Sequence, residues 1–271
     1  MRERRRDSSR PTILFGVVDL SGSAAVFSDS ASLYDLLYDD KDTSGEIKWI
    51  LSRLKARGLP DSGKILEIGA GTGRHARGFA DVGYTVTATD PSEEMLKRAA
   101  PHDRVSFLRA DGVNLRLDQK FDAVLALFHV VSYQTTPAMV SSFFNTASEH
   151  LNNGGLFGFD IWYSPAVLFL QPEDRVITKE VDELRVTRLA KPVEDVPHSR
   201  VDVKYTYTVE EVTSGTARTF EEVHAMRHFT STEIQLIAEG HGLSVIDSCE
   251  FMSERAPSRE TWGVWFTLQK S

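Results

Sequence analysis

One stretch of the sequence is the most informative about the fold: Ile65-Leu66-Glu67-Ile68-Gly69-Ala70-Gly71-Thr72-Gly73-Arg74-His75. An apolar run followed by closely spaced glycines is typical of a strand that turns sharply into a helix, where the backbone can approach a ligand. Arg74 stands where the dinucleotide fingerprint Gly-x-Gly-x-x-Gly has its third glycine. The loop therefore indicates a ligand site at a strand-to-helix junction, with a purely structural turn as the alternative.

Short apolar runs alternate with helical patterns from Lys64 onward, which predicts a parallel α/β sheet. The expected strands are Lys64–Ile68, Thr85–Thr89, Val105–Arg109, Phe121–Leu127 and Gly155–Asp160. The expected helices between them are Gly73–Val82, Ser92–Ala100 and Pro137–Leu151. Because such sheets bind ligands at the carboxyl ends of their strands, functional residues are expected at the strand-to-loop junctions.

Acidic residues follow three of these strands in order. Glu67 lies just before the glycine loop, Asp90 ends the second strand, and Asp111 follows the third. A carboxylate at the end of the second strand can accept hydrogen bonds from both ribose hydroxyls. Each acid alone could be a solvated strand cap, but their ordered recurrence favours a nucleoside-containing ligand.

With Phe121-Asp122-x-Val124 after them, these motifs resemble those of class I S-adenosylmethionine-dependent methyltransferases, over residues 33–165 and 228–271. The resemblance implies a Rossmann-like α/β fold: a seven-stranded methyltransferase sheet flanked by helices. Two further strands, Leu243–Phe251 and Thr261–Gln269, would complete that sheet with one antiparallel strand. It also implies S-adenosyl-L-methionine as the cofactor.

The resemblance assigns the cofactor site residue by residue. Asp90 would hold the ribose, Asp111 would meet the adenine amino group, and Leu127 with Phe128 would pass beneath the sulfonium. The full set implied for the cofactor is Tyr34, Glu67, Gly69, Ala70, Gly71, Gly73, Asp90, Asp111, Gly112, Leu127 and Phe128.

The pattern changes after Pro172 to alternating segments rich in Val, Thr and Tyr. Three antiparallel strands are predicted at Val176–Leu189, Val201–Val212 and Thr216–His228, inserted after the fifth core strand. The expected organisation is a flexible arm over residues 1–30, a cofactor-binding methyltransferase domain over 31–171 and 229–271, and a β insertion over 172–228. The insertion could be a lid over the site or the surface of a homodimer.

The segments YDLLYDD, LFHVVSY and FDIWYSP resemble those of nucleotide-sugar methyltransferases, especially the N-methyltransferases of amino-deoxy sugars. This implies methyl transfer to an amine or hydroxyl of a small polar acceptor. His129 and Tyr133 are the candidate catalytic residues, because histidine ordinarily titrates near neutrality and the tyrosine stands where the sugar enzymes present a polar ring. Tyr38, Trp162 and Tyr163 are candidate acceptor contacts, although Trp162 and Tyr163 could equally be core aromatics.

Composition narrows the alternatives. The net charge of −8 argues against a nucleic-acid partner, and no apolar run is long enough for a membrane span. A single cysteine excludes an intramolecular disulfide and a cysteine-cluster metal site, which favours a cytoplasmic protein without a metal. An O-methyltransferase of another small natural product, an NAD-type dehydrogenase and a non-catalytic protein with the methyltransferase fold stay open as alternatives.

Overall fold

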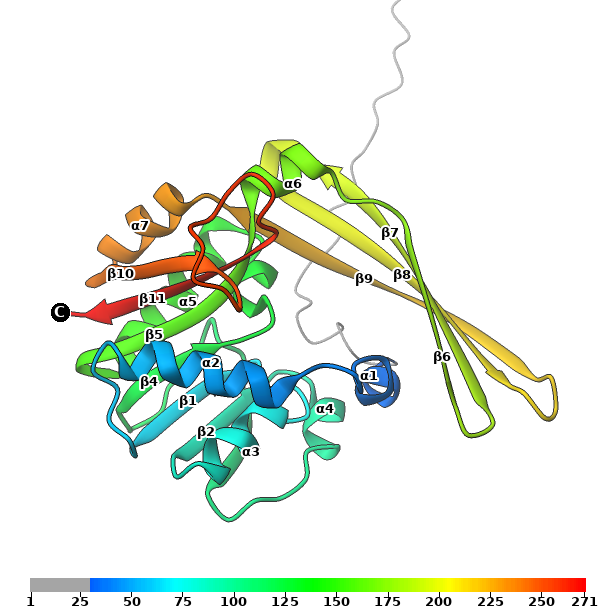
Figure 1. Ribbon diagram of the computed structural model, residues 1–271, viewed down its shortest axis with the longest axis horizontal. Coiled ribbons are helices and arrows are strands. Elements are labelled where there is room, and N and C mark those ends of the chain that lie inside the picture. Colours follow the sequence, from blue (N-terminus) through cyan, green and yellow to red (C-terminus); the bar gives the residue numbers. More distant parts are fainter. Residues whose placement is uncertain (1–29) are drawn as a thin grey trace, which may run out of the picture.

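The computed structural model describes residues 30–271, so the predicted flexible arm lies, apart from Ser30, outside the described residues. A helix-flanked sheet forms the core, and a long twisted set of hairpins extends from it (Figure 1). The fold is therefore an α/β arrangement around a mixed sheet, as the alternating sequence pattern predicts. No helix within residues 30–271 is long and apolar enough to cross a bilayer.

Five parallel strands build the centre of the sheet in the order β3-β2-β1-β4-β5. They are β1 (Lys64–Ile68), β2 (Thr85–Asp90), β3 (Val105–Arg109), β4 (Phe121–Ala126) and β5 (Leu151–Tyr163). Beyond β5, strand β11 (Gly263–Lys270) runs antiparallel both to β5 and to β10 (Leu243–Glu250). The carboxyl ends of the parallel strands therefore share one edge, where a ligand site is expected.

Helices cover both faces of this sheet because each carries one apolar stripe. On one face, α2 (Thr43–Lys55) and α3 (Arg74–Asp81) bury Ile50 and Phe79 against β1, β2 and β4. On the other face, α5 (Pro137–His150) and α7 (Ser231–Glu239) bury Phe144 and Ile234 against β4, β5 and β11. The Thr230 hydroxyl accepts the Glu233 N–H at 3.2 Å, which caps α7 as its capping-box sequence predicts.

The insertion contains four strands, so the prediction of three was wrong. They are β6 (Arg175–Val181), β7 (Leu184–Asp195), β8 (Arg200–Glu211) and β9 (Ala217–Phe229). The predicted single strand Val176–Leu189 is broken by a two-residue turn at Asp182-Glu183, where Asp182 has φ 53°. The second of the four strands also runs beyond the predicted end at Leu189, because β7 continues through Pro192 and pairs with β8 as far as Asp195.

The insertion is continuous with the core sheet. Trp162 of β5 pairs with Gly263 of β11 on one side and with His228 of β9 on the other. One hydrogen-bonded sheet of eleven strands results, rather than a separate seven-stranded sheet. The first helix, α1 (Ala31–Leu37), packs its Leu33 and Leu37 against Val186 and Tyr207 of the insertion, so it lies between core and hairpins (Figure 1).

Candidate active site

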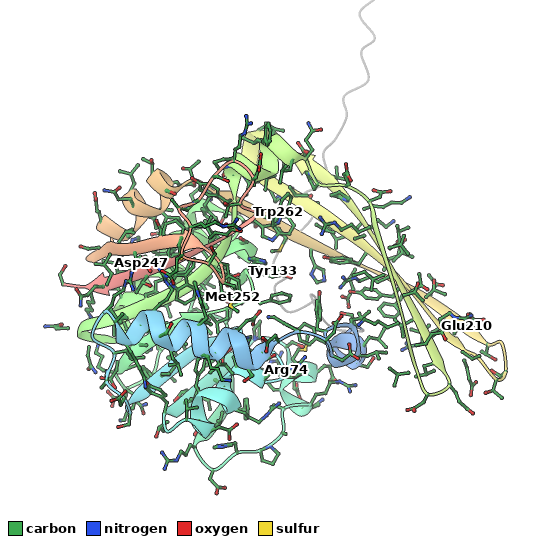
Figure 2. All side chains as sticks on the ribbon, viewed as in Figure 1. Arg74, Tyr133, Glu210, Asp247, Met252 and Trp262 are labelled. Carbon is green, nitrogen blue, oxygen red and sulfur yellow. The ribbon has the colours of Figure 1, made fainter. Side chains whose placement is uncertain are left out.

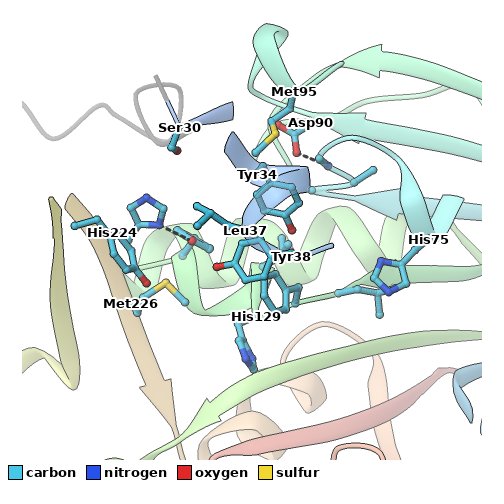
Figure 3. Close-up of a pocket in the computed structure, with 18 of the residues that line it drawn as sticks. Ser30, Tyr34, Leu37, Tyr38, His75, Asp90, Met95, His129, His224 and Met226 are labelled. Atoms are coloured by element: carbon cyan, nitrogen blue, oxygen red, sulfur yellow. Dashed lines mark hydrogen bonds between the residues drawn. The ribbon is translucent and has the colours of Figure 1, made fainter. Parts of the chain in front are cut away.

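A cavity of about 350 Å³ lies at the carboxyl ends of β1, β2 and β4, facing α1 and the hairpins. Figure 3 draws this cavity with His224 and Met226 on one side and His75 on the other. Its lining includes twelve of the predicted site residues: Tyr34, Tyr38, Glu67, Gly69, Ala70, Gly71, Asp90, Leu127, Phe128, His129, Tyr133 and Trp162.

The first wall of the cavity is the loop wall, made by Glu67, Gly69, Ala70, Gly71 and Asp90. Gly71 has φ 58°, and a Cβ built on it meets nothing within 4 Å, so the loop leaves open space for a ligand. The Glu67 side chain is buried, and its Oε2 has no hydrogen-bond partner among the described residues. Burial raises the pKa of the Glu67 carboxyl to about 8, so a cationic ligand group nearby would favour its ionised form.

Asp90 connects the glycine loop to the end of β2. Its Oδ2 accepts the Gly71 N–H and its Oδ1 accepts the Ser92 N–H, both at 2.8 Å. Burial raises the pKa of this carboxyl above its ordinary value, and these hydrogen bonds oppose the rise. Each carboxylate oxygen has more than one acceptor direction, so Asp90 can hold the loop and still accept ligand hydroxyls. The orphaned Glu67 oxygen, the open space at Gly71 and Asp90 together fit S-adenosylmethionine.

Four predicted site residues do not line the cavity. A Cβ on Gly73 would meet Phe107, and one on Gly112 would meet Phe143, so these glycines permit close packing behind the loop. Asp111 Oδ1 accepts the Val113 N–H at 3.1 Å within its own turn. The Tyr163 hydroxyl accepts a hydrogen bond from Ser231 at the start of α7.

The chain after β4 turns through two consecutive left-handed residues, Phe128 (φ 63°) and His129 (φ 64°). Non-glycine residues in this conformation are strained and concentrate at functional sites. The buried Asp160 of β5 accepts the His129 backbone N–H, and its Oδ2 lies 2.7 Å from His129 Nδ1. Burial alone would raise the pKa of the Asp160 carboxyl, but the contact with His129 lowers it. The same contact orients the His129 ring, which lies in the cavity wall.

Aromatic rings from α1 and its C-terminal end reach across to the end of β4. The Tyr34 and Tyr38 centroids are 4.9 Å apart, and Tyr38 meets Phe128 edge-on at 5.2 Å. The Lys41 ammonium lies 3.8 Å from the centroid of the Phe128 ring. The two tyrosines, spaced four residues apart in the sequence, therefore face the same cavity as the loop wall (Figure 3).

The opposite side of the cavity is the hairpin wall, formed by Arg175, Arg188, Tyr205, Tyr207, His224 and Met226. None of these residues was among the predicted site residues, although the strand face shared by His224 and Met226 suggested contact with solvent or substrate. The Arg188 guanidinium is buried, donates to the Tyr38 hydroxyl at 2.8 Å and lies 5.0 Å from the Tyr205 ring. The only available signal was the two-residue spacing of His224 and Met226, which places both on one face of their strand.

Tyr133 lies where the two walls meet. Its hydroxyl is 2.9 Å from Nδ1 of His224 on β9, and Nε2 of that histidine is 3.4 Å from Oε2 of Glu222. His228 lies four residues after His224 on β9. It contacts Ser164 instead and does not line the cavity. Within residues 30–271, no three His, Cys, Asp or Glu side chains gather as a metal site would require.

Comparisons with known proteins identify the class of domain. Residues 65–155 match a family model described as a methyltransferase domain. The dTDP-3-amino-3,4,6-trideoxy-alpha-D-glucopyranose N,N-dimethyltransferase of Streptomyces venezuelae is 27% identical over 223 residues, covering 80% of this chain and 91% of that protein. The dTDP-3-amino-3,6-dideoxy-alpha-D-glucopyranose N,N-dimethyltransferase of Streptomyces fradiae is 26% identical, covering 82% and 85% respectively.

Solved structures show the same fold. The crystal structure of Streptomyces venezuelae DesVI superimposes with a TM-score of 0.75 at 24% identity, covering 90% of this chain and 99% of that one. Residues 65–155 thus belong to the methyltransferase domain family. The matched domain, the relatives and the shared fold together support an S-adenosylmethionine-dependent methyltransferase.

Proposed function

We propose that the protein transfers methyl groups to the amine of a nucleotide-linked amino sugar. The proposal rests on one observation: the loop wall and the hairpin wall, which contains basic and aromatic side chains, line the same cavity. The two Streptomyces relatives, whose printed activities are N,N-dimethylations of dTDP-linked amino sugars, support this acceptor class.

The charge distribution favours an anionic acceptor. The protein carries a net charge of −8, yet Arg175 and Arg188 line the cavity. Nε of Arg188 is buried without a hydrogen-bond partner among the described residues. An unsatisfied guanidinium N–H is costly in an empty pocket and well suited to a phosphate oxygen. A diphosphate linked to the sugar would supply that oxygen.

The residues at the cavity then divide between two tasks. The cofactor supplies an electrophilic methyl carbon when bound, so orientation of the acceptor nitrogen can account for much of the rate. Glu67, Gly71 and Asp90 bind on one side, and the hairpin wall positions the acceptor on the other. The attacking nitrogen must be neutral, so a hydrogen-bond acceptor in the cavity wall would help it lose its proton, and His129 and Tyr133 are the candidates.

Two measurements test the proposal. Calorimetry with S-adenosylhomocysteine tests the loop wall, and methyl uptake from labelled S-adenosylmethionine tests the acceptor. The acceptors compared are a dTDP-linked 3-amino sugar, its 3-hydroxy analogue and the free amino sugar. We expect methylation of the first alone. Methylation of the 3-hydroxy analogue in preference would make the enzyme an O-methyltransferase, and equal use of the free sugar would remove the diphosphate from the proposal.

A further inference from the structure

The insertion contributes more than a wall to the cavity. Tyr133, His224 and Glu222 form a chain of contacts that runs from the cavity into the hairpins, with Tyr133 Oη 2.9 Å from Nδ1 and Glu222 Oε2 3.4 Å from Nε2. The tyrosine comes from the 3₁₀ turn Val130–Tyr133 after β4, and the other two come from β9. His224 lies 91 residues from Tyr133 in the sequence, so only the fold brings them together.

We propose that His224 and Glu222 are positioning residues that turn the Tyr133 hydroxyl into the hydrogen-bond acceptor, and the proton relay, for the substrate amine. This assignment rests on the proposed amine acceptor. This assignment makes β9 part of the catalytic apparatus, whereas the sequence predicted that the insertion as a whole is a lid or a dimer surface.

Glu222 determines the direction of the hydrogen bonds. Its carboxylate accepts from the Ser30 backbone N–H at 3.0 Å and from the Ser30 hydroxyl at 2.6 Å. Burial opposes ionisation, but the contacts with His224 and Ser30 hold the pKa of Glu222 below its ordinary value. A carboxylate can only accept, so neutral His224 carries its proton on Nε2 and accepts the Tyr133 proton at Nδ1. Because Tyr133 lines the cavity, its oxygen can then accept a hydrogen bond from the substrate amine.

Burial excludes the simpler possibility of a free phenolate. Tyr133 lines the cavity but is otherwise enclosed, and this burial raises the pKa of its phenol well above the ordinary value. The neighbouring Tyr205, whose ring centroid lies 4.7 Å from that of His224, raises the pKa of Tyr133 further. Tyr133 therefore enters the reaction as a hydroxyl, and a proton that it accepts must be matched by one that it passes on.

The proton step balances along this chain. An ammonium group of the acceptor gives its proton to Tyr133 Oη while the phenolic proton moves to His224 Nδ1. The positive charge then resides on the imidazolium beside the Glu222 carboxylate. The freed lone pair on nitrogen forms the new N–C bond as the C–S bond breaks and its electron pair stays on sulfur. The imidazolium later returns its extra proton to water.

The first test uses the imidazole nitrogens and needs no acceptor. Nitrogen-15 NMR of the full chain labelled at histidine, with His224 assigned from its absence in His224→Gln, should show the neutral Nε2–H tautomer at pH 8. Glu222→Gln should shift it toward the mixture typical of a free ring. An Nδ1–H tautomer in the wild type would overturn the assignment, whether or not the amino-sugar acceptor is correct.

The second test is a double-mutant cycle on methyl transfer to the dTDP-linked 3-amino sugar. Tyr133→Phe and His224→Gln should each lower kcat by about 100-fold. Because both act through one hydroxyl, the double variant should lose about the same 100-fold rather than the product. Multiplying losses would overturn the relay. If the wild type does not methylate this acceptor at all, the proposed function fails. The His224 tautomer measured in the first test then decides whether the hydrogen-bond directions among Tyr133, His224 and Glu222 are correct.

His228→Gln is the matched control for the cycle. His228 is a second buried histidine on β9, but it contacts Ser164 and lies outside the cavity lining. Its kcat should stay within threefold of the wild type. S-adenosylhomocysteine affinity should stay within twofold in all variants. A parallel loss in His228→Gln, or a loss of cofactor-product affinity in His224→Gln, would reduce His224 to a structural role.

Discussion

The loop wall and the hairpin wall face the same cavity but are built differently. Glu67, Gly71 and Asp90 come from the carboxyl ends of two adjacent strands, β1 and β2, and the loop wall acts largely through backbone shape and two carboxyl groups. In the hairpin wall, Arg188 is a side chain of β7 and His224 is a side chain of β9, and of these two strands only β9 pairs with a core strand. The comparison shows that a binding surface made from backbone turns is encoded locally, whereas one made from strand side chains depends on register.

The largest expected effect is at Gly69 of the loop wall, where an added Cβ would be crowded and would also meet an unfavourable backbone conformation. Gly69→Ala places a Cβ 2.6 Å from Val130 at φ 74°, so backbone strain adds to overpacking. We expect a loss of about 3 kcal/mol in the free energy of unfolding, measured by urea denaturation. Gly215, in the β8–β9 turn, has φ 69° with nothing within 4 Å of a Cβ. Gly215→Ala should cost only about 1 kcal/mol, and equal losses would contradict this difference.

Removing the carboxylate that joins the loop wall to β2 comes next. Asp90→Ala should weaken S-adenosylhomocysteine binding by about 1–3 kcal/mol, because a charged hydrogen-bond acceptor is lost. Calorimetry measures the change. Asp122 is the control, since it accepts the Lys64 N–H at the opposite edge of the parallel strands, where β1 and β4 begin. Asp122→Ala should leave the affinity unchanged, and an unchanged affinity in Asp90→Ala would remove Asp90 from the cofactor site.

The hairpin wall is tested by Arg188→Gln. The variant loses the charge, the hydrogen bond to Tyr38 and the contact with the Tyr205 ring. We expect KM for the dTDP-linked amino sugar to rise about 10-fold, equivalent to ~1.4 kcal/mol, with S-adenosylhomocysteine affinity preserved. Arg185→Gln, on the same strand but paired with Glu180 and Glu210, should leave KM unchanged. A fall in cofactor-product affinity without a change in KM would place Arg188 on the cofactor side.

The smallest expected effect is the pH dependence that Glu67 gives to stability. Its folded-state pKa of about 8 lies above its ordinary value of 4.5, so the folded protein holds a proton between these values that the unfolded chain releases. The contribution of the protonated Glu67 to folding stability is fully present below pH 4.5 and is lost as the pH rises toward 8. Between pH 6 and 7 the free energy of unfolding, measured with urea, should fall by about 1 kcal/mol more in the wild type than in Glu67→Gln. Parallel curves would mean that Glu67 is ionised in the folded protein.

The sequence predicted the core and the loop wall because their signals are local. The motif from Ile65 to His75 contains a strand, a turn and a helix start within one stretch, and Asp90 follows it at the end of the next strand. Gly73 and Gly112 belong to the same motifs but face Phe107 and Phe143. A motif thus indicates where the chain turns, and cannot by itself separate residues that face the ligand from those that let the turn pack.

The hairpin wall could not be predicted for two physical reasons. The turn at Asp182-Glu183 has neither glycine nor proline, so two strands read as one and the faces of β6 and β7 were not assigned. The contact of His224 with Tyr133 depends on the register with which β9 meets β5, and a shift of one residue would turn His224 away from the cavity. Arg188 was hidden in an alternating pattern that any exposed strand can have.

The short pairing of β9 with the end of β5 has a consequence for how such an enzyme can change its acceptor. Two residue pairs, Trp162 with His228 and Tyr163 with Phe229, anchor the strand that carries His224 to the strand that carries Asp160. Apart from Glu222 and His224, side chains of the hairpins beyond that anchor can be exchanged without changing the loop wall. Substitutions at those other hairpin positions are therefore a route to new acceptors that leaves the loop wall intact.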